Sequence, residues 1–445
     1  MDIQLPGQVK FIIDTLEEAG FEAYAVGGCV RDSIIGRNPQ DWDITTVAKP
    51  EQVKGLFRRT IDTGIAHGTV TVMLDRNGYE VTTYRIDGTY EDARHPNGVT
   101  FTPDLLEDLK RRDFTINAMA YHPERGLVDA FDGIADMRGG VIRCVGDPAE
   151  RFGEDALRML RAVRFAAQLG FQVEGCTRQA IADMAPLLGK VSAERIQVEL
   201  VKLLVSQNPQ EMRTLYETGM SAVILPEWDA MMETKQENPH HAYTVGEHTI
   251  RVLMHTPQDR ILRLAALFHD VAKPVCRTVD EKGVDHFYGH PEQGAVLTRK
   301  ILRRLKFDNA TIDMTARLVA GHDVNPALHD RGVRRAIRRV GMECYPAIFD
   351  LKLADILAQS DYGRQEKLEA LERYRELYRE IMARGDCLSL KELAVDGKDL
   401  MELGIPAGRK LGEILSRLLE LVVEEPEKNT KEYLTGYTLE NLFIR

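Results

Sequence analysis

The sequence lacks the features of a membrane or secreted protein. No apolar run reaches the roughly 18 residues that a membrane-spanning helix needs. The N-terminus does not join a basic segment to an apolar stretch and a small-residue cleavage site, so we expect no secretory signal. The six cysteines lie far apart without a CxxC pair, which disfavours a zinc knuckle and is typical of a reducing compartment. These absences predict a cytoplasmic protein.

Positive charge is also scarce. The 445 residues include 58 Lys and Arg against 69 Asp and Glu, a formal net charge of −11. This balance disfavours a protein that coats nucleic acid by overall charge, although basic patches can still exist locally. The length is too great for one compact core and predicts about two to four domains.

Two patterns of secondary structure divide the chain. The first 145 residues alternate short β-rich runs with helical runs, and Asn77 and Gly78 are expected to form a hairpin turn. From Ala149 onward, apolar residues recur at helical spacing almost to the C-terminus. The sequence therefore predicts an α+β fold, in which a mixed sheet with helices is followed by an all-helical remainder. The predicted domains are a head (1–145), a neck (146–225), a body (240–384) and a tail (385–445).

A glycine pair lies between the first predicted strand and a predicted helix, in the segment GGCVRD at 27–32. Glycine lets the backbone approach a phosphate closely, and the free N–H groups at the start of a helix favour an anion. Gly28 and Arg31 are therefore candidates for binding phosphate, Arg31 through its guanidinium group. A glycine pair alone more often only makes a turn.

Two carboxylates, Asp41 and Asp43, are separated by one residue on a predicted strand. Alternate residues of a strand point to one face, so both side chains can contact one or two hard cations. Mg²⁺ favours such carboxylates together with substrate phosphates. Glu80 on the hairpin would complete a two-metal arrangement or accept the proton of an attacking hydroxyl. The combination predicts attack of a hydroxyl on the α-phosphate of a nucleoside triphosphate, whereas an isolated pair would be two surface acids.

The ordered motifs resemble the class II tRNA nucleotidyltransferases, namely the CCA-adding enzymes and bacterial poly(A) polymerases. After GGCVRD and DWD come EDLKRRDFTINAMAY (107–121), DAFDGIADMRGGVIR (129–143) and GEDALRMLRAVRF (153–165). The resemblance is close over about residues 20–205. It implies a polymerase-β-like head with magnesium on the two aspartates, a helical neck, and a body and tail that hold tRNA.

The resemblance also implies nucleotide contacts within the segment RRDFTINA. Arg112 would contact the nucleotide, while Asp113 and Asn117 would shape the ribose pocket. A carboxylate there can accept a hydrogen bond from a 2′-hydroxyl, which favours ribonucleotides. The alternative for Arg111, Arg112 and Asp113 is an internal ion pair that only braces the head.

The segment EDALR predicts how bases are selected. Asp155 and Arg158 are three residues apart, so on one helix they would lie side by side. A carboxylate accepts hydrogen bonds and a guanidinium donates them, which matches the amino group and ring nitrogen that cytosine and adenine share. In the family this pair selects CTP and ATP; the alternative is a surface salt bridge. Arg161 and Arg164 follow on the same helix as candidates for contacting the triphosphate or the primer 3′ end.

A second constellation, in the body, resembles the HD phosphohydrolases. Its segments are HHAYTVGEHTIRVL, RLAALFHDVAKP, GHPEQGA, AGHD and KLADILAQSD. The resemblance implies the metal ligands His248, His269, Asp270 and Asp355, with His290 and His322 added in binuclear members. Imidazole with carboxylate suits Mn, Fe, Ni or Zn better than Mg alone. The site would serve a phosphodiesterase or phosphatase that acts on damaged 3′ ends such as cyclic phosphates, or it would be a scaffold without activity.

Arginines at helical spacing predict an RNA contact in the body. The stripe comprises Arg331, Arg334, Arg335, Arg338 and Arg339. Charge runs are usually solvated faces, but a stripe of arginine alone favours the phosphate backbone. The glycine-rich segment 397–412 is a tRNA-binding arm by resemblance.

The resemblance implies an enzyme that adds C, C and A to the 3′ end of tRNA without a nucleic-acid template. The expected partners are tRNA, CTP and ATP, with Mg²⁺ in the head and no membrane or obligate protein partner. An A-adding enzyme and a poly(A) polymerase share this chemistry, and segment 87–101 resembles the family loop for switching to ATP. Two other classes stay open: an HD phosphohydrolase with a nucleotide-sensing head, and a non-catalytic RNA-binding protein.

Overall fold

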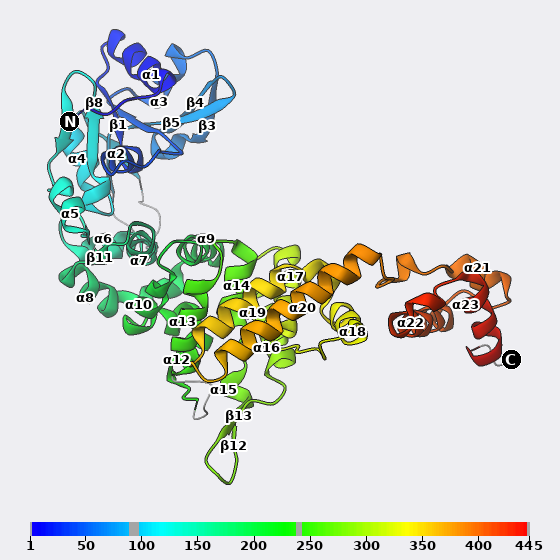
Figure 1. Ribbon diagram of the computed structural model, residues 1–445. Helices are drawn as coiled ribbons and strands as arrows, with labels where there is room; N and C mark the ends of the chain where they lie inside the picture. Colours follow the sequence, from blue (N-terminus) through cyan, green and yellow to red (C-terminus); the bar gives the residue numbers. More distant parts are fainter. Residues whose placement is uncertain (1, 89–97, 237–242, 443–445) are drawn as a thin grey trace. The chain divides into compact units, whose positions relative to one another are not determined.

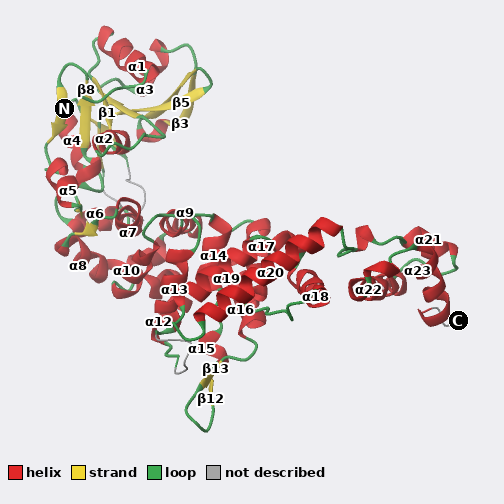
Figure 2. Ribbon diagram, in the orientation of Figure 1, coloured by secondary structure: helices red, strands yellow, loops and turns green. Residues whose placement is uncertain are grey.

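The computed structural model describes residues 2–88, 98–236 and 243–442. The chain forms two compact units, Met1–Pro226 and Glu227–Arg445. Strands are concentrated in the first unit, whereas the second is almost entirely helical (Figure 2). The predicted α+β head and helical remainder are therefore confirmed. Every helix in the described part of the chain is too short or too polar to cross a membrane.

A seven-stranded mixed sheet organises the head (Figure 1). In spatial order its strands are β3 (Thr60–Gly64), β4 (Thr69–Leu74), β5 (Asn77–Thr83), β2 (Asp43–Thr46), β1 (Ala23–Val26), β8 (Met119–His122) and β9 (Gly126–Asp129). The β2–β5 pair is parallel, and the other neighbouring strands are antiparallel. The interior strand β1 is buried along its whole length, which is the pattern of a strand covered on both faces.

The hairpin between β4 and β5 turns two residues earlier than predicted. Asp75 and Arg76 form the turn, both with positive φ (46° and 69°), and Asn77 is already paired in β5. Gly78 also lies in the strand, where an added Cβ would be only 2.8 Å from Cγ2 of Thr71 on β4. The predicted turn at Asn77 and Gly78 is therefore wrong, because this glycine serves the close approach of two strands.

Amphipathic helices complete the first unit. Helix α1 (Gly7–Glu18) buries Val9, Ile12, Ile13 and Leu16, which recur at the spacing of one helix face. The other helices are α2 (Gly28–Ile34), α3 (Pro50–Leu56), α4 (Leu105–Lys110), α5 (Gly133–Gly139), α6 (Pro148–Glu154), α7 (Leu157–Leu169), α8 (Gly175–Met184), α9 (Ala193–Leu204), α10 (Met212–Glu217) and α11 (Met220–Ile224). Helices α7 and α9 pack against each other. Two short strand pairs, β6 (Arg85–Asp87) with β7 (Val99–Phe101) and β10 (Val141–Ile142) with β11 (Gln172–Val173), lie outside the main sheet.

The second unit is a helical assembly with one small hairpin, β12 (Thr278–Val279) and β13 (Asp285–His286). Its helices are α12 (Pro226–Glu233), α13 (Val245–His255), α14 (Arg260–Phe268), α15 (Lys273–Cys276), α16 (His290–Arg304), α17 (Asn309–Gly321), α18 (Asp330–Val340), α19 (Ala347–Ala358), α20 (Arg364–Arg384), α21 (Gly397–Glu402), α22 (Arg409–Glu424) and α23 (Lys431–Tyr437). The last three helices bury a small core of their own around Leu400, Leu418, Val422 and Leu434. Helix α22 also packs against α18.

Candidate active site and candidate metal centre

Strand pairing brings the predicted catalytic carboxylates to one edge of the head sheet. Asp43 begins β2 and is aligned with Glu80 on the parallel strand β5, so both side chains point to the same face. Asp41 precedes β2, and all three carboxylates are exposed. Desolvation of the carboxyl group and the negative charges of Glu80 and Asp41 raise the pKa of Asp43, although Arg112 opposes the shift. Among the described residues these three carboxylates do not form a group with oxygens all within 4.8 Å of one another, but neighbouring carboxylates whose charges raise the pKa of Asp43 suit a hard divalent cation such as Mg²⁺.

The glycine turn at the start of α2 allows a close approach of charged side chains. Gly27 has a φ of +82°, and an added Cβ would lie 2.8 Å from Nη1 of Arg112. Arg31 donates from Nη1 to Oδ1 of Asn117 over 2.6 Å, and its guanidinium lies 5.0 Å from the ring centroid of Phe165. Arg31, a predicted phosphate ligand, and Arg112, a predicted nucleotide contact, therefore lie beside the glycine pair at the start of α2.

Asp113 ties the head to the neck. Its Oδ2 accepts from Nε of Arg161 over 2.8 Å, and its Oδ1 accepts from Nδ2 of Asn117 over 3.2 Å. Burial alone raises the pKa of Asp113, but the positive charges of Arg161 and Arg158 hold it below its usual range. The carboxylate is therefore charged and oriented at the junction of the predicted ribose-pocket and base-selecting segments.

A cavity of about 270 Å³ brings most of the predicted nucleotide-binding residues together. It is lined by Arg111, Arg112, Asp113, Asp155, Leu157, Arg158, Arg161 and Arg195. Arginines dominate this lining, and two carboxylates interrupt it. Such a wall suits an anionic ligand that also presents hydrogen-bond donors.

The base-selecting segment is not one helix, contrary to the prediction. Asp155 is extended (φ −142°, ψ 104°) and separates α6 from α7. Its Oδ1 accepts from the backbone N–H of Leu157 over 3.0 Å. Aspartate competes in this way with the helical backbone, which makes it a poor residue for a helix interior. Asp155 and Arg158 nevertheless line the same cavity, although they do not belong to one continuous helix.

Asp155 and Arg158 each form a salt bridge with a residue that the sequence analysis did not predict as its partner. Oδ2 of Asp155 accepts from Nη2 of Arg195 over 2.6 Å. Arg158 donates from Nη1 to Oε2 of Glu154 over 2.6 Å and from Nη2 to the carbonyl of Arg111 over 2.9 Å. The spacing of Glu154 and Arg158, four residues apart, was the available signal for the second contact. These bonds fix an acceptor and a donor in one wall before any ligand binds.

Arg164 has a different environment from Arg161. It is buried, with its guanidinium 3.7 Å from the ring centroid of Phe165 and its Nε 2.5 Å from Oε2 of Glu199 on α9. Burial lowers the pKa of Arg164 to about 10, although Glu199 partly opposes the shift. Arg164 therefore joins α7 to α9 instead of contacting the triphosphate or primer, so that prediction is corrected.

Arg111 forms an internal ion pair and also lines the cavity. Its Nε and Nη2 donate to Oδ1 of the buried Asp108 over 2.9 and 2.8 Å. The other oxygen of Asp108 accepts from Oγ1 of Thr45 over 3.0 Å. Burial raises the pKa of Asp108, but Arg111 and Arg112 outweigh this and lower it. Asp108 therefore links α4 to strand β2, which begins at Asp43.

In the second unit, the structure gathers all six predicted metal ligands. Two groups of three have ligand atoms within 4.8 Å of one another: His248, His269 and Asp270, and Asp270, His290 and His322. Asp270 is shared, since its Oδ2 lies 3.0 Å from Nε2 of His269 and its Oδ1 lies 3.4 Å from Nε2 of His290. Asp355 joins from α19, with Oδ1 2.9 Å from Nε2 of His248. A carboxylate shared by two groups of imidazoles is a donor set that fits one or two divalent transition-metal ions.

Backbone contacts orient three of the four imidazoles. Nδ1 of His269, His290 and His322 lies 2.7–2.8 Å from the carbonyl of the residue three positions earlier. A carbonyl only accepts, so Nδ1 carries the proton and a neutral ring directs the Nε2 lone pair into the cluster. Nε2 of His290 and of His322 are 3.3 Å apart. Divalent cations would satisfy these facing lone pairs, so the cluster fits metal ions.

Lys273 is a neighbour of the cluster that the sequence did not single out. Its Nζ lies 2.8 Å from Oδ2 of Asp270 and donates to Oε1 of Gln236 over 2.8 Å. Burial raises the pKa of Asp270, but His269 and Lys273 outweigh it and hold the carboxyl well below its usual range. The shared carboxylate is therefore charged.

The arginine stripe on α18 faces the tail. Arg331 and Arg335 pair with Glu424 of α22. Arg334 is buried, donating from Nε to the carbonyl of Val423 over 2.7 Å and from Nη1 to Oδ2 of Asp386 over 3.0 Å. It therefore fixes the tail to α18 instead of making the predicted contact with RNA. The other four arginines line a cavity of about 780 Å³ together with Arg417: Arg331, Arg335, Arg338 and Arg339.

Two sequence predictions fall partly outside the described residues. The expected loop for switching to ATP, 87–101, contains residues 89–97, and the first HD segment begins within 237–242. The ends of the predicted loop, β6 and β7, are paired.

Comparison with known proteins matches this arrangement along the chain. Family models described as the poly A polymerase head domain, a probable RNA and SrmB-binding site of polymerase A, and a putative tRNA nucleotidyltransferase domain 2 match residues 23–143, 170–232 and 292–437. The head sheet with its carboxylates thus defines a nucleotidyltransferase.

Similarity to individual proteins extends over nearly the whole length. A CCA-adding enzyme of Lactiplantibacillus plantarum is 38% identical over 438 residues, 98% of this chain and 97% of the relative. One of Lactobacillus helveticus is 37% identical, covering 97% and 96%. The crystal structure of the Bacillus stearothermophilus CCA-adding enzyme in complex with CTP has a TM-score of 0.73 at 31% identity and covers 98% of both chains. The chain therefore belongs to the CCA-adding enzymes, a family of tRNA nucleotidyltransferases.

Proposed function

We propose that the chain adds C, C and A to the 3′ end of tRNA from CTP and ATP, without a nucleic-acid template. The observation that carries this proposal is the cavity in which a held acceptor, Asp155, and a held donor, Arg158, lie in one wall. The similar Bacillus stearothermophilus structure, which is in complex with CTP, supports a cytidine nucleotide as one substrate.

The carboxylates at the sheet edge supply the reaction centre. Asp41 and Asp43 would hold Mg²⁺, with Glu80 beside them on β5. When bound, the metal would neutralise phosphate charge and favour the deprotonated 3′-hydroxyl. Glu80 would complete the ligand set or take the proton of that hydroxyl, which attacks the α-phosphate and releases pyrophosphate.

Positive side chains around the glycine turn would hold the triphosphate. Arg112, from the segment after α4, approaches Gly27, and Arg31 of α2 lies beside Gly28. Asp113, oriented by Asn117 and Arg161, would accept a hydrogen bond from a ribose hydroxyl. Binding in this pose would place the base against α7 and the α-phosphate towards the carboxylates.

Base selection would follow from hydrogen-bond polarity. Cytosine and adenine each present an amino donor beside a ring-nitrogen acceptor, which suits Asp155 as acceptor and Arg158 as donor. Uracil and guanine present a carbonyl beside a ring N–H, so each would leave both side chains mismatched. A buried polar group without a partner costs about 1–3 kcal/mol. Two mismatches would therefore disfavour the wrong base by about 2–6 kcal/mol.

The metal assignment is tested with Asp41→Ala in a primer-extension assay on tRNA that lacks its 3′ end. We expect incorporation to be lost while tRNA binding, measured by filter retention, is kept. Asp62→Ala is the matched control, because Asp62 is an exposed aspartate of the same sheet and pairs with Lys54. Normal turnover by Asp41→Ala would contradict the assignment.

The six-ligand cluster favours a second function in the body. We propose that it holds one or two divalent metal ions, Mn, Fe, Ni, Zn or Mg, and hydrolyses a phosphoester at the 3′ end of RNA. The carrying observation is the shared carboxylate of Asp270 between two pairs of imidazoles with directed lone pairs. His269→Ala should abolish metal-dependent opening of a 2′,3′-cyclic phosphate end to a phosphomonoester, whereas His255→Ala, which changes an exposed histidine of α13, should not. Hydrolysis by the His269→Ala variant would contradict this function and leave a scaffold as the alternative.

The remaining regions would position tRNA. We propose that the four arginines of the α18 cavity contact the phosphate backbone and that the tail, 385–445, extends this contact. In this proposal 1–145 is the head, 146–225 the neck and 240–384 the metal-binding body. Salt bridges to Glu424 and Glu420 would open as phosphates replace the carboxylates.

A further inference from the structure

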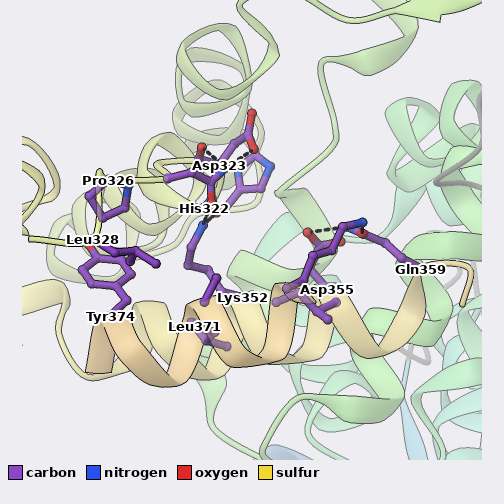
Figure 3. A pocket seen from close by; sticks show the side chains of 13 residues that line it. His322, Asp323, Pro326, Leu328, Lys352, Asp355, Gln359, Leu371 and Tyr374 are labelled. Atoms are coloured by element: carbon purple, nitrogen blue, oxygen red, sulfur yellow. Dashed lines mark hydrogen bonds between the residues drawn. The ribbon is translucent and has the colours of Figure 1, made fainter. Parts of the chain in front are cut away.

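A cavity adjoins the metal cluster, and the functions proposed above assign it no ligand. Its volume is about 470 Å³, within the roughly 300–1,000 Å³ range of small-molecule sites. The walls come from the segment after α17 and from helices α19 and α20. Figure 3 shows Leu328 and Tyr374 on one side of the view, Asp355 and Gln359 on the other, and Lys352 between them.

The cavity shares its wall with the cluster. His322 and Asp355, two members of the six-ligand set, also line this cavity. A neighbouring cavity of about 540 Å³ reaches Asp270 and His290 from another direction and shares His322 and Asp355 with the first. A group bound in the first cavity would therefore lie directly beside any ion that the cluster holds.

The lining is apolar on some sides and hydrogen-bonding on others. Leu328, Ile356 and Leu371 supply apolar surface. Lys352 is buried and donates to the carbonyl of His322 over 2.8 Å and to Oδ1 of Asn325 over 3.0 Å. A flat base fits apolar walls, and ribose hydroxyls fit ammonium and amide groups. A phosphate alone would use the charges but not the apolar surface.

We propose that this cavity binds the nucleoside attached to the phosphoester that the cluster hydrolyses. The proposal rests on the phosphohydrolase function proposed for the cluster and names its substrate class, a nucleotide at an RNA 3′ end. Hydrolysis of a 2′,3′-cyclic phosphate adds one water to phosphorus and breaks one P–O bond. The products are a phosphomonoester and one free ribose hydroxyl, so no other reactant is needed.

The test compares two cyclic phosphates that differ only by the base. Adenosine 2′,3′-cyclic phosphate carries the base, and methyl riboside 2,3-cyclic phosphate does not. Leu328→Trp is designed to fill the cavity from a side chain that is 42% exposed, so the protein should fold. Leu390→Trp is the control, since Leu390 is similarly exposed (47%) in the same unit but does not line the cavity.

The full-length chain with Mn²⁺ is used throughout. We expect Leu328→Trp to lower kcat/KM for the adenosine substrate on the order of tenfold, and to change the base-free rate by no more than about twofold. Leu390→Trp should change neither rate. Equal losses on both substrates, or no loss on either, would overturn the nucleoside site.

A binding measurement keeps this test independent of hydrolysis. Adenosine 3′-monophosphate is titrated calorimetrically into the wild type and both variants. The cavity predicts two binding events in the wild type, one of them in the head, and a single event in Leu328→Trp. A single event in the wild type, or two events that persist in Leu328→Trp, would overturn the cavity. Two wild-type events without any hydrolysis would instead overturn the phosphohydrolase function and keep the site.

Discussion

The substitution Asp155→Ala tests how the residues that line the cavity select a base. The change removes the acceptor that faces the amino group of cytosine or adenine, and leaves Arg158 with its own partner, Glu154. A hydrogen bond to a charged group contributes about 1.5–3 kcal/mol. Its loss should lower kcat/KM for CTP and ATP by about 10- to 150-fold.

The effect on the wrong nucleotides should have the opposite sign. A uracil carbonyl that faces the Asp155 carboxylate is repelled, and alanine removes this repulsion. We therefore expect incorporation of UTP to be unchanged or faster, so that the ratio of CTP to UTP falls by at least the loss on CTP. The ratio is measured by single-turnover primer extension on tRNA that lacks CCA, with each nucleotide offered alone.

Two controls separate selection from damage. Arg178→Ala removes an exposed arginine of α8, paired with Glu217, and should leave the ratio unchanged. Arg195→Ala removes the side chain that holds Oδ2 of Asp155 and should lower the ratio less than Asp155→Ala does. A ratio of CTP to UTP that stays within about twofold of wild type in Asp155→Ala would refute the reasoning.

Three further substitutions follow from individual contacts. Gly27→Ala should raise the KM for CTP, because the added Cβ would displace Arg112, and the φ of +82° with ψ of −131° costs alanine about 1–3 kcal/mol. Gly20→Ala, with a φ of +85° and no neighbour within 4 Å, should destabilise the fold without raising KM. If Glu80 takes the proton of the 3′-hydroxyl, Glu80→Gln should lower kcat in primer extension by about 100-fold or more. An unchanged kcat would exclude that role, and Glu51→Gln on α3 is the control. Arg334→Met should cost the tail about 1–3 kcal/mol in urea unfolding, because it removes the bonds to the carbonyls of Val423 and Glu424 and one of the two arginine partners of Asp386. The exposed Arg335→Met should cost about 0.5 kcal/mol or less, and equal costs would contradict this account.

The sequence predicted the architecture well because its signals are local. Alternation and helical periodicity identified the α+β head and the helical remainder. It also placed Glu80 on the strand that flanks Asp43, and the parallel register then aligns the two residues.

Its errors come from features that spacing alone does not determine. A spacing of three residues puts Asp155 and Arg158 on one helix face only if the helix continues, and Asp155 itself ends that continuity by bonding the backbone of Leu157. Periodicity likewise placed Arg334 on the arginine face, but not the tail that covers it. Arg164 is covered by α9 in the same way.

Contacts between residues far apart in the chain were not predicted from the sequence either. Arg195 lies 40 positions from Asp155, and its role depends on how α9 packs against α7. Lys273 is only three residues from Asp270, so its spacing was visible, yet nothing in the spacing identified it as a partner of the metal-binding carboxylate. The six ligands of the second unit, in contrast, were predicted through resemblance to a family, not from spacing.

The central claim is tested most directly by offering tRNAs that lack one, two or three 3′ residues, each with CTP, ATP or both, and reading product lengths at single-nucleotide resolution. We predict that the tRNA lacking three residues gains two with CTP alone and three with both nucleotides, and that growth then stops. The tRNA ending in CC should gain one residue with ATP alone. Growth of a single A on the CC-ended tRNA with no use of CTP, or continued addition of A, would contradict CCA addition and indicate an A-adding enzyme or a poly(A) polymerase.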